Sequence, residues 1–168
     1  MRTIAVTDRL LIREFAPDEQ ETYLSHFLDE DVARYIPKRT REERVNIFNL
    51  ALANYEINGD LQIWGMFDKH DGAFIGSCLL RPYRHDHTKA EMGYSMEKKY
   101  WGKGMATEMA IAMVKLALEN PENNGIVAVT VIDNIGSQRV LEKAGFKRGD
   151  NVVEDGEELA YFEYQRSN

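Results

Sequence analysis

The stretch Lys98-Lys-Tyr-Trp-Gly-Lys-Gly-Met-Ala-Thr-Glu108 is the most informative part of this sequence. It lies between a strand-like run, Ala90 to Met96, and an apolar segment with helical spacing, Gly104 to Leu118. Gly102 and Gly104 let the backbone bend tightly, and the free N–H groups at a helix start attract anions. The stretch predicts a turn that cradles a phosphate or pyrophosphate, and a purely structural glycine turn remains an equal alternative.

This turn departs from two common phosphate-binding motifs. No Lys-Ser or Lys-Thr pair follows Gly104, as a P-loop requires, and the three-glycine dinucleotide fingerprint is missing. A nucleotide-binding protein that uses the turn for ATP is therefore the weaker alternative.

On both sides of this turn, segments with the apolar spacing of strands alternate with segments that have the spacing of helices, as in a mixed α/β (α+β) protein. The expected order is strand, two helices, three strands, helix, strand, helix and two strands, in one domain over residues 1–168. The expected ranges are strand 10–13, helices 17–27 and 40–58, strands 61–67, 73–80 and 90–96, helix 104–118, strand 126–132, helix 136–144, and a terminal hairpin of strands 146–153 and 159–164. Residues 81–89 are expected to form a polar loop.

The composition is that of a water-soluble globular chain, with 168 residues of which 43% are hydrophobic. A formal charge of -7 gives no drive toward nucleic acid or anionic lipid and favours a neutral or cationic partner. No apolar run is long enough to cross a membrane. A lone cysteine, Cys78, and the lack of a signal-peptide pattern predict a cytoplasmic protein. The composition does not determine the oligomeric state.

A second informative stretch, Asp133-Asn-Ile-Gly-Ser-Gln-Arg-Val-Leu-Glu-Lys-Ala-Gly-Phe146, begins where the next buried strand ends. Open sheets usually present their ligands at such an edge. Asn134 can cap the following helix, and Ser137 can donate or accept a hydrogen bond. A helix cap with no further role is the structural alternative for Asn134.

Taken together, these stretches resemble the GNAT N-acetyltransferase superfamily, and most closely its branch of ribosomal-protein-alanine N-acetyltransferases. The motifs that carry the resemblance are Tyr100 to Glu108, Asp133-Asn-x-x-Ser137, Glu142 to Phe146, Thr7 to Arg13, and Phe74-Ile-Gly76, so it extends over nearly the whole chain. Trp101 departs from the Gln or Arg that opens the superfamily motif, and this substitution is typical of the branch. Gly104 and Ala106 remain as the matching small residues.

The resemblance implies a mixed central sheet in which two splayed parallel strands hold acetyl-CoA, a cosubstrate that needs no metal. The backbone amides implied to hold its pyrophosphate are those of Gly102, Lys103, Gly104, Met105, Ala106 and Thr107. Tyr94, Ser95 and Met96 would pair with the pantetheine arm, and Asn134 would contact it. Ser137 matches the residue that protonates the leaving thiolate. Tyr83, Arg84 and residues 35–37 would border the acceptor pocket.

Glu91 is the candidate general base, because an alkylammonium with a pKa near ~10 must lose a proton before it attacks a thioester. Its carboxylate interrupts an apolar strand, and desolvation there would strengthen it as a base. The alternative is a carboxylate that faces solvent or pairs with Lys89. Backbone N–H groups near Tyr94 to Met96 would hold the tetrahedral intermediate. Cys78 is expected to fill the core, and His85-Asp-His87 is expected to be a surface loop rather than a metal site.

The sequence thus predicts direct transfer of an acetyl group from acetyl-CoA to a primary amine, with a protein or peptide alpha-amine as the first choice of acceptor. A small-molecule amine, such as a polyamine or an aminoglycoside, is the alternative acceptor. A non-catalytic acyl-CoA-binding module remains an alternative function, which turnover would exclude.

Overall fold

The computed structural model describes residues 1–167, so Asn168, the last residue of the predicted domain, lies outside the described residues. Contacts divide the described chain into two compact units. The first unit contains residues 1–79 and 94–105, and the second contains residues 80–93 and the chain from Ala106 onward. Two long strands, β4 (Phe74–Tyr83) and β5 (Asp86–Met96), contribute residues to both units. A single domain over the whole chain stays a prediction.

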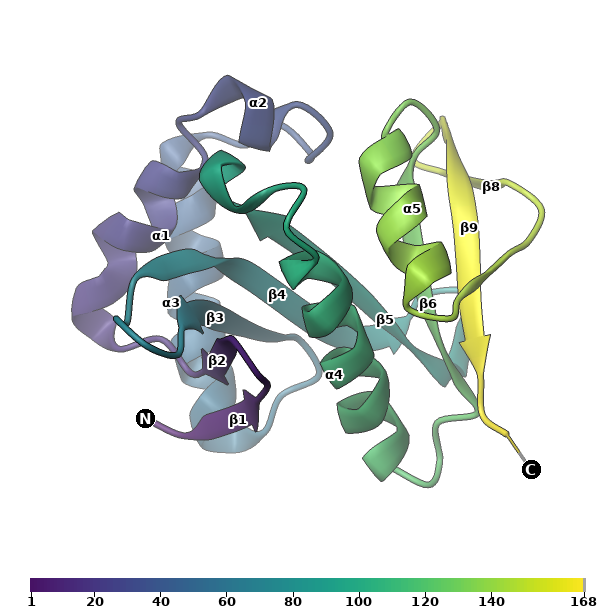
Figure 1. Ribbon diagram of the computed structural model, residues 1–168, viewed down its shortest axis with the longest axis horizontal. Coiled ribbons are helices and arrows are strands. Elements are labelled where there is room, and N and C mark those ends of the chain that lie inside the picture. Colours follow the sequence, from purple (N-terminus) through teal and green to yellow (C-terminus); the bar gives the residue numbers. More distant parts are fainter. Residues whose placement is uncertain (168) are drawn as a thin grey trace. The chain divides into compact units, whose positions relative to one another are not determined.

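The first unit combines an antiparallel sheet with helices (Figure 1). Its strands lie in the order β1-β2-β3-β4, and β2 pairs antiparallel with both β1 and β3. Its complete elements are β1 (Thr3–Val6), β2 (Leu10–Arg13), the 3-10 helix η1 (Pro17–Glu19), α1 (Gln20–His26), α2 (Glu30–Ala33), α3 (Arg41–Ile57), β3 (Gln62–Asp68) and the 3-10 helix η2 (Lys98–Tyr100).

Local signals explain where the longest helix of this unit, α3, begins and ends. The Thr40 hydroxyl accepts a hydrogen bond from Glu43 N–H, and the Glu43 carboxylate accepts one from Thr40 N–H, which completes a capping box. Asn58 ends the helix in the left-handed conformation, with φ of 50°. Helices α1 and α3 contact each other, and their apolar faces bury the rings of Tyr23 and Phe48 in a core with Phe15.

The strands β4 and β5 approach each other very closely in the first unit. A Cβ added at Gly76 would lie 2.1 Å from the Ser95 carbonyl oxygen and 2.9 Å from the Met96 Cα. Just beyond β5, Glu97 N–H donates to the Ile75 carbonyl at 2.7 Å. Only glycine leaves room for this approach, so Gly76 helps determine where β5 ends.

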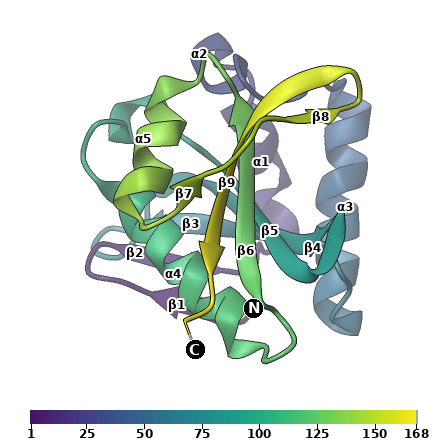
Figure 2. The same cartoon turned by 90° about the vertical axis from the view of Figure 1, so that its right-hand side faces the viewer.

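The second unit is built on four strands in the order β5-β6-β9-β7, with β8 also paired to β9. Figure 2 shows β6 and β9 side by side, and their antiparallel register covers all of β6. The elements that lie entirely within this unit are β6 (Gly125–Val131), α5 (Ile135–Lys143), β7 (Lys147–Arg148), β8 (Val152–Glu154) and β9 (Glu157–Gln165). Helix α4 (Met105–Glu119) also belongs to it, except for its first residue.

The β5–β6 pair is parallel, whereas the other pairs described within the two units are antiparallel. Its register covers three positions, from Lys89 opposite Gly125 to Glu91 opposite Val127. Both strands continue past this short register, β5 to Met96 and β6 to Val131. The mixed sheet with one parallel pair confirms the predicted fold class.

The predicted helices and strands follow one another in the predicted sequence order, and the structure adds further short elements. The prediction omitted β1 and the one-turn helix α2, and it placed one strand at residues 146–153 where the structure has β7 and β8. Gly149 separates these two strands, and its N–H donates to the Tyr161 carbonyl at 2.9 Å. Hydrophobic period alone does not separate the two- and three-residue strands β7 and β8, because each is too short to show a full alternation of apolar and polar residues.

The predicted polar loop over residues 81–89 is wrong. Strand β4 extends to Tyr83 and β5 begins at Asp86, so Arg84 and His85 alone connect them. His87 therefore lies in a strand rather than in a loop. Most side chains in this part of the hairpin face water, so most of them are polar. The alternation of apolar residues by which a strand is predicted is therefore missing here.

We expect Gly76→Ala to lower the free energy of unfolding by about 1 to 3 kcal/mol, because the new methyl group must displace the β5 backbone. Urea denaturation measures the change. Gly136→Ala is the control, since Gly136 lies in α5 and its added Cβ meets nothing closer than 3.9 Å. This control should be stabilised by up to about 1 kcal/mol. Equal effects of both substitutions would contradict the close approach.

Candidate active site

The glycine-rich turn between β5 and α4 has the shape that an anion cradle needs. Gly102 and Gly104 have φ values of +70° and +78°, a region that side chains rarely adopt, and α4 begins at the next residue, Met105. A Cβ at Gly102 would meet nothing within 4 Å, so its glycine serves backbone conformation rather than packing. The first N–H groups of α4 lack partners within the helix and suit a phosphate.

Two side chains hold this turn in place within the first unit. Trp101 Nε1–H donates to the Met96 carbonyl at 2.8 Å, and Arg9 Nη1 donates to the Lys103 carbonyl at 2.8 Å. Trp101 thereby ties the turn directly to the end of β5. This bond gives a physical role to the residue that departs from the superfamily motif. The Lys103 side chain is exposed, in agreement with either a phosphate contact or a solvated surface lysine.

A buried polar network that the sequence did not reveal lies beside the end of β5. His26 on α1 is fully buried, with its Nδ1 3.0 Å from Glu97 Oε1 and its Nε2 2.8 Å from Ser95 Oγ. Because a carboxylate can only accept, Nδ1–H donates to Glu97 and Nε2 accepts from the Ser95 hydroxyl. Ser77 Oγ lies 3.4 Å from Ser95 Oγ and extends the network to β4.

Burial lowers the pKa of His26, against the opposing effect of the Glu97 carboxylate. The lowered pKa favours the neutral ring, which agrees with a hydrogen bond from the Ser95 hydroxyl to Nε2. Ser95 is buried as well, so its predicted cofactor contact would come from its backbone rather than from its hydroxyl. The partners of His26 are about 70 residues away in the sequence, and no local pattern indicates them.

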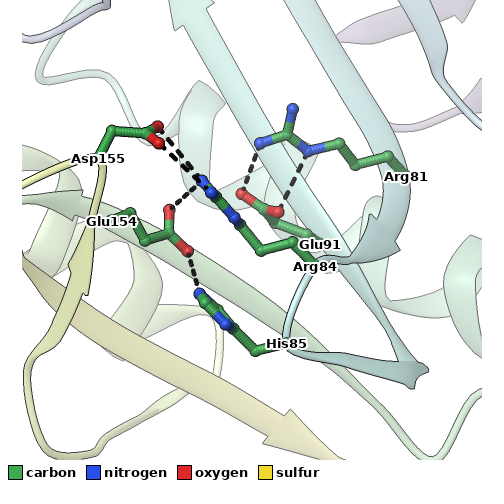
Figure 3. Close-up of polar contacts among 6 residues, drawn as sticks. All are labelled: Arg81, Arg84, His85, Glu91, Glu154 and Asp155. Atoms are coloured by element: carbon green, nitrogen blue, oxygen red, sulfur yellow. Dashed lines mark hydrogen bonds and ion pairs between the residues drawn. The ribbon is translucent and has the colours of Figure 1, made fainter.

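Glu91, the candidate base, is 4% exposed on β5 in the second unit. Its two carboxylate oxygens accept hydrogen bonds from Arg81, from Nη2 at 3.0 Å and from Nε at 3.1 Å (Figure 3). The alternative in which Glu91 faces solvent or pairs with Lys89 is wrong. Lys89 instead forms an ion pair with Glu163 at 2.9 Å.

Asn134 and Ser137 lie together at the start of α5. Asn134 is the N-cap residue, and its Oδ1 accepts a hydrogen bond from Ser137 N–H at 3.2 Å. The expected helix cap is confirmed, and it places the half-buried Ser137 in the first turn of α5. The partial positive charge of a helix N-terminus favours a thiolate or phosphate nearby.

The predicted site residues are distributed over both units. Tyr94, Ser95, Met96, Gly102, Lys103, Gly104 and Met105 belong to the first unit, and Glu91, Ala106, Thr107, Asn134 and Ser137 belong to the second. Within the first unit, Trp101 joins the end of β5 to the glycine turn. Within the second, the cap joins Asn134 to Ser137.

Cys78 is fully buried in β4, and burial raises its pKa to about 12. A thiol with that pKa is a poor nucleophile near neutral pH, which confirms its expected role in the core. Among residues 1–167, no three His, Cys, Asp or Glu side chains are grouped as a metal site would need. Over the same residues, every helix is too short or too polar to traverse a lipid bilayer.

Comparison with known proteins defines the class of this fold and site. Residues 9–147 match the family model described as an acetyltransferase (GNAT) domain. The uncharacterized N-acetyltransferase YoaA of Bacillus subtilis (strain 168) is 26% identical over 151 residues, which cover 88% of this chain and 85% of YoaA. The crystal structure of a GNAT-family acetyltransferase from Bacillus anthracis superposes with a TM-score of 0.79 at 25% identity, covering 98% of each chain.

A ribosomal L7/L12 alpha-N-protein acetyltransferase, RimL, in complex with coenzyme A shares the fold with a TM-score of 0.81, at 13% identity and 98% coverage of each chain. The proteins of this class transfer acyl groups. This chain belongs to the GNAT acetyltransferase family, and it is an acetyl-CoA-dependent N-acetyltransferase.

The buried His26 predicts a specific pH dependence of stability. Its folded-state pKa is lowered, so the unfolded chain, with a pKa near ~6.5, takes up the proton first as the pH falls. The contribution of His26 to the free energy of unfolding is therefore complete above about pH 6.5 and decreases below it. We expect the advantage of the wild type over His26→Gln, about 1 to 3 kcal/mol at pH 8, to shrink toward pH 5.

Urea denaturation at pH 8, 7, 6 and 5 measures this advantage. His70→Gln is the matched control, because His70 is exposed in the turn after β3. Its difference from the wild type should stay near zero throughout. A difference for His26→Gln that grows on acidification would show that the histidine is charged in the folded protein.

Proposed function

We propose that this protein transfers the acetyl group of acetyl-CoA directly to the alpha-amine of a protein or peptide, with Glu91 as general base and Ser137 as general acid. The observation that carries the proposal is the buried Glu91 carboxylate, which lies between the buried Ala90 and Met92 of β5 and which Arg81 holds through both oxygens. Burying a charge is costly unless the charge is paired, and the bidentate Arg81 supplies that pairing.

Arg81 orients Glu91 without exhausting its capacity to accept protons. Each carboxylate oxygen has two lone-pair sites, and Arg81 occupies one on each. The remaining sites accept a proton from the acceptor's ammonium, either directly or through a water molecule. The Arg81 side chain is 46% exposed, so it stays hydrated while Glu91 changes its protonation state.

Acetyl-CoA would be bound through backbone groups. The amides of residues 102–107 hold its pyrophosphate, with Gly102 and Gly104 giving the turn its shape, and Tyr94 to Met96 pair with its pantetheine arm. A backbone N–H in the same strand segment stabilises the oxyanion of the tetrahedral intermediate. The thioester supplies the activated acetyl group, and no acyl-enzyme forms.

Ser137 then protonates the leaving thiolate. Its position in the first turn of α5 places the hydroxyl where the helix dipole favours developing negative charge. Asn134, besides capping the helix, contacts the cofactor arm through the remaining capacity of its side-chain amide.

A protein or peptide alpha-amine is the proposed acceptor because the sequence most resembles the ribosomal-protein branch of the family. A small-molecule amine is the alternative, and a panel of peptides, polyamines and aminoglycosides separates the two. Thiol release with no member of the panel would favour a non-catalytic acyl-CoA-binding module. The free thiol of Cys78 fits a cytoplasmic location, where thiols stay reduced.

We expect Glu91→Gln to lower kcat by about 10²- to 10⁴-fold, because the amide cannot accept the ammonium proton. Release of free thiol from acetyl-CoA measures turnover, and calorimetry measures cofactor binding, which should change less than about twofold.

Glu157→Gln is the control for this experiment. Glu157 is an exposed strand carboxylate in the same unit, so its loss removes one charge without touching Glu91. Equal turnover in Glu91→Gln and Glu157→Gln would refute the assignment of the base.

Ser137→Ala should lower kcat by about tenfold or more, since the leaving thiolate then takes its proton from water. The cap from Asn134 to the backbone N–H of residue 137 persists in this variant, so stability should change little. Restoration of activity in Ser137→Thr would support proton donation by the hydroxyl. An alanine variant as active as the wild type would rule that role out.

A further inference from the structure

Glu154 is a buried carboxylate whose charge the protein leaves poorly compensated. Its side chain is 8% exposed, and its Oε1 is buried without any hydrogen-bond partner. Buried carboxylates in folded proteins are normally paired and hydrogen-bonded, because an uncompensated charge destabilises the fold. Glu154 therefore differs from Glu91, whose two oxygens each accept a hydrogen bond.

The fold holds Glu154 in this position through the β8–β9 hairpin. Asp155 and Gly156 form its two-residue turn with φ values of 51° and 80°, as such tight hairpins require. Glu154 is the last residue of β8 and lies opposite Glu157 in the register. The backbone of Glu154 is therefore held by the hairpin register.

The cations nearest to Glu154 are weak partners (Figure 3). His85 Nε2 lies 3.4 Å from Oε1 without the geometry of a hydrogen bond, and Arg84 Nη1 lies 3.9 Å from Oε2. Arg84 also reaches Asp155 through two long hydrogen bonds of 3.3 and 3.4 Å. Both basic side chains are nearly half exposed, and exposed pairs of this kind contribute little to stability.

Tyr83 connects this carboxylate with the proposed base. Burial, followed by the charges of Glu154 and Glu91, raises the pKa of Tyr83. The Tyr83 ring packs against the His85 ring, with centroids 5.3 Å apart. Arg81 binds Glu91, and Arg84 and His85, which follow it closely at the β4–β5 turn, approach Glu154, so both carboxylates belong to one cluster of the second unit.

We propose that Glu154, with Asp155, binds a second positive charge of the acceptor, an ammonium or guanidinium group other than the reacting amine. Arg84 occupies this position while no acceptor is bound. The inference rests on the proposed function, because it takes the amine acceptor to lie beside Glu91. An incoming cation that hydrogen-bonds to Oε1 gains a strong charge-assisted bond, and it displaces only the 3.4 Å approach of His85 to that oxygen and the weak contacts of Arg84 with Oε2 and Asp155.

Two matched pairs of probes test the proposal. One pair are peptides and the other pair are small molecules, so they show which kind of acceptor supplies the second positive charge. The peptide pair is the amide of alanyl-lysyl-alanyl-alanine and its norleucine analogue, and the small-molecule pair is 1,5-diaminopentane and 1-aminopentane. Calorimetry with the coenzyme A-loaded protein gives the Kd of each probe, and thiol release gives KM. In the wild type, the dication of at least one pair should bind about tenfold more tightly than its monocation.

Glu154→Gln should reduce this preference for the dication to about twofold or less. Arg84→Gln should increase it by about threefold, because the substitution removes the competing internal cation. Glu157→Gln is the control for net charge in the same hairpin and should leave the preference unchanged. Because Arg84 is exposed, its variant tests the proposal even if Glu154→Gln fails to fold.

The outcomes distinguish this proposal from the proposed function. A dication preference that depends on Glu154 in calorimetry, without thiol release from any probe, would support the cation site and reject the acceptor assignment. Turnover of both members of each pair with equal Kd values would support the acetyltransferase assignment and overturn the cation site. A preference that Arg84→Gln decreases would also overturn it.

Discussion

The close contact between β4 and β5 in the first unit is the constraint on which the end of β5, the proposed cofactor-binding segment, depends. Gly76 allows the two backbones to meet at a distance that any side chain would prevent. The Glu97 N–H then donates to the Ile75 carbonyl of β4, and the indole of Trp101 and the ring of His26 each bind a group at the end of β5. This segment is already held from several sides. An extended acyl carrier can therefore pair with it at little cost in conformational free energy, because binding does not have to order the segment.

Signals within a few residues of each other predicted much of the fold and of the site. The helix over residues 40–58, the glycine turn before α4 and the Asn134 cap all depend on neighbouring residues, and each appears in the structure as the sequence indicated. Such features follow from local backbone chemistry, which a single sequence contains. The segments that match the acetyltransferase family have the same local character.

Contacts between distant residues could not be predicted in the same way. His26 is a helix residue at an ordinary position, and its role depends on Ser95 and Glu97, which lie about 70 residues further along the chain. The partner of Glu91 is a different case. Arg81 lies across a tight hairpin, and the interaction was hidden because the expected loop over residues 81–89 is in fact two strands. A predicted hairpin with longer strands on both sides of the turn would place Arg81 and Glu91 close together across the two strands.

The two buried carboxylates of the second unit show how stability and function differ in this protein. Glu91 has a bidentate arginine, which offsets much of the cost of burial and fixes the direction of its free lone pairs. Glu154 has only distant and exposed partners, so the folded chain bears a cost there that a better cation would relieve. A chain that carries a net charge of -7 could easily replace this one carboxylate with an amide. An uncompensated charge beside a candidate base is better explained by a ligand than by the fold.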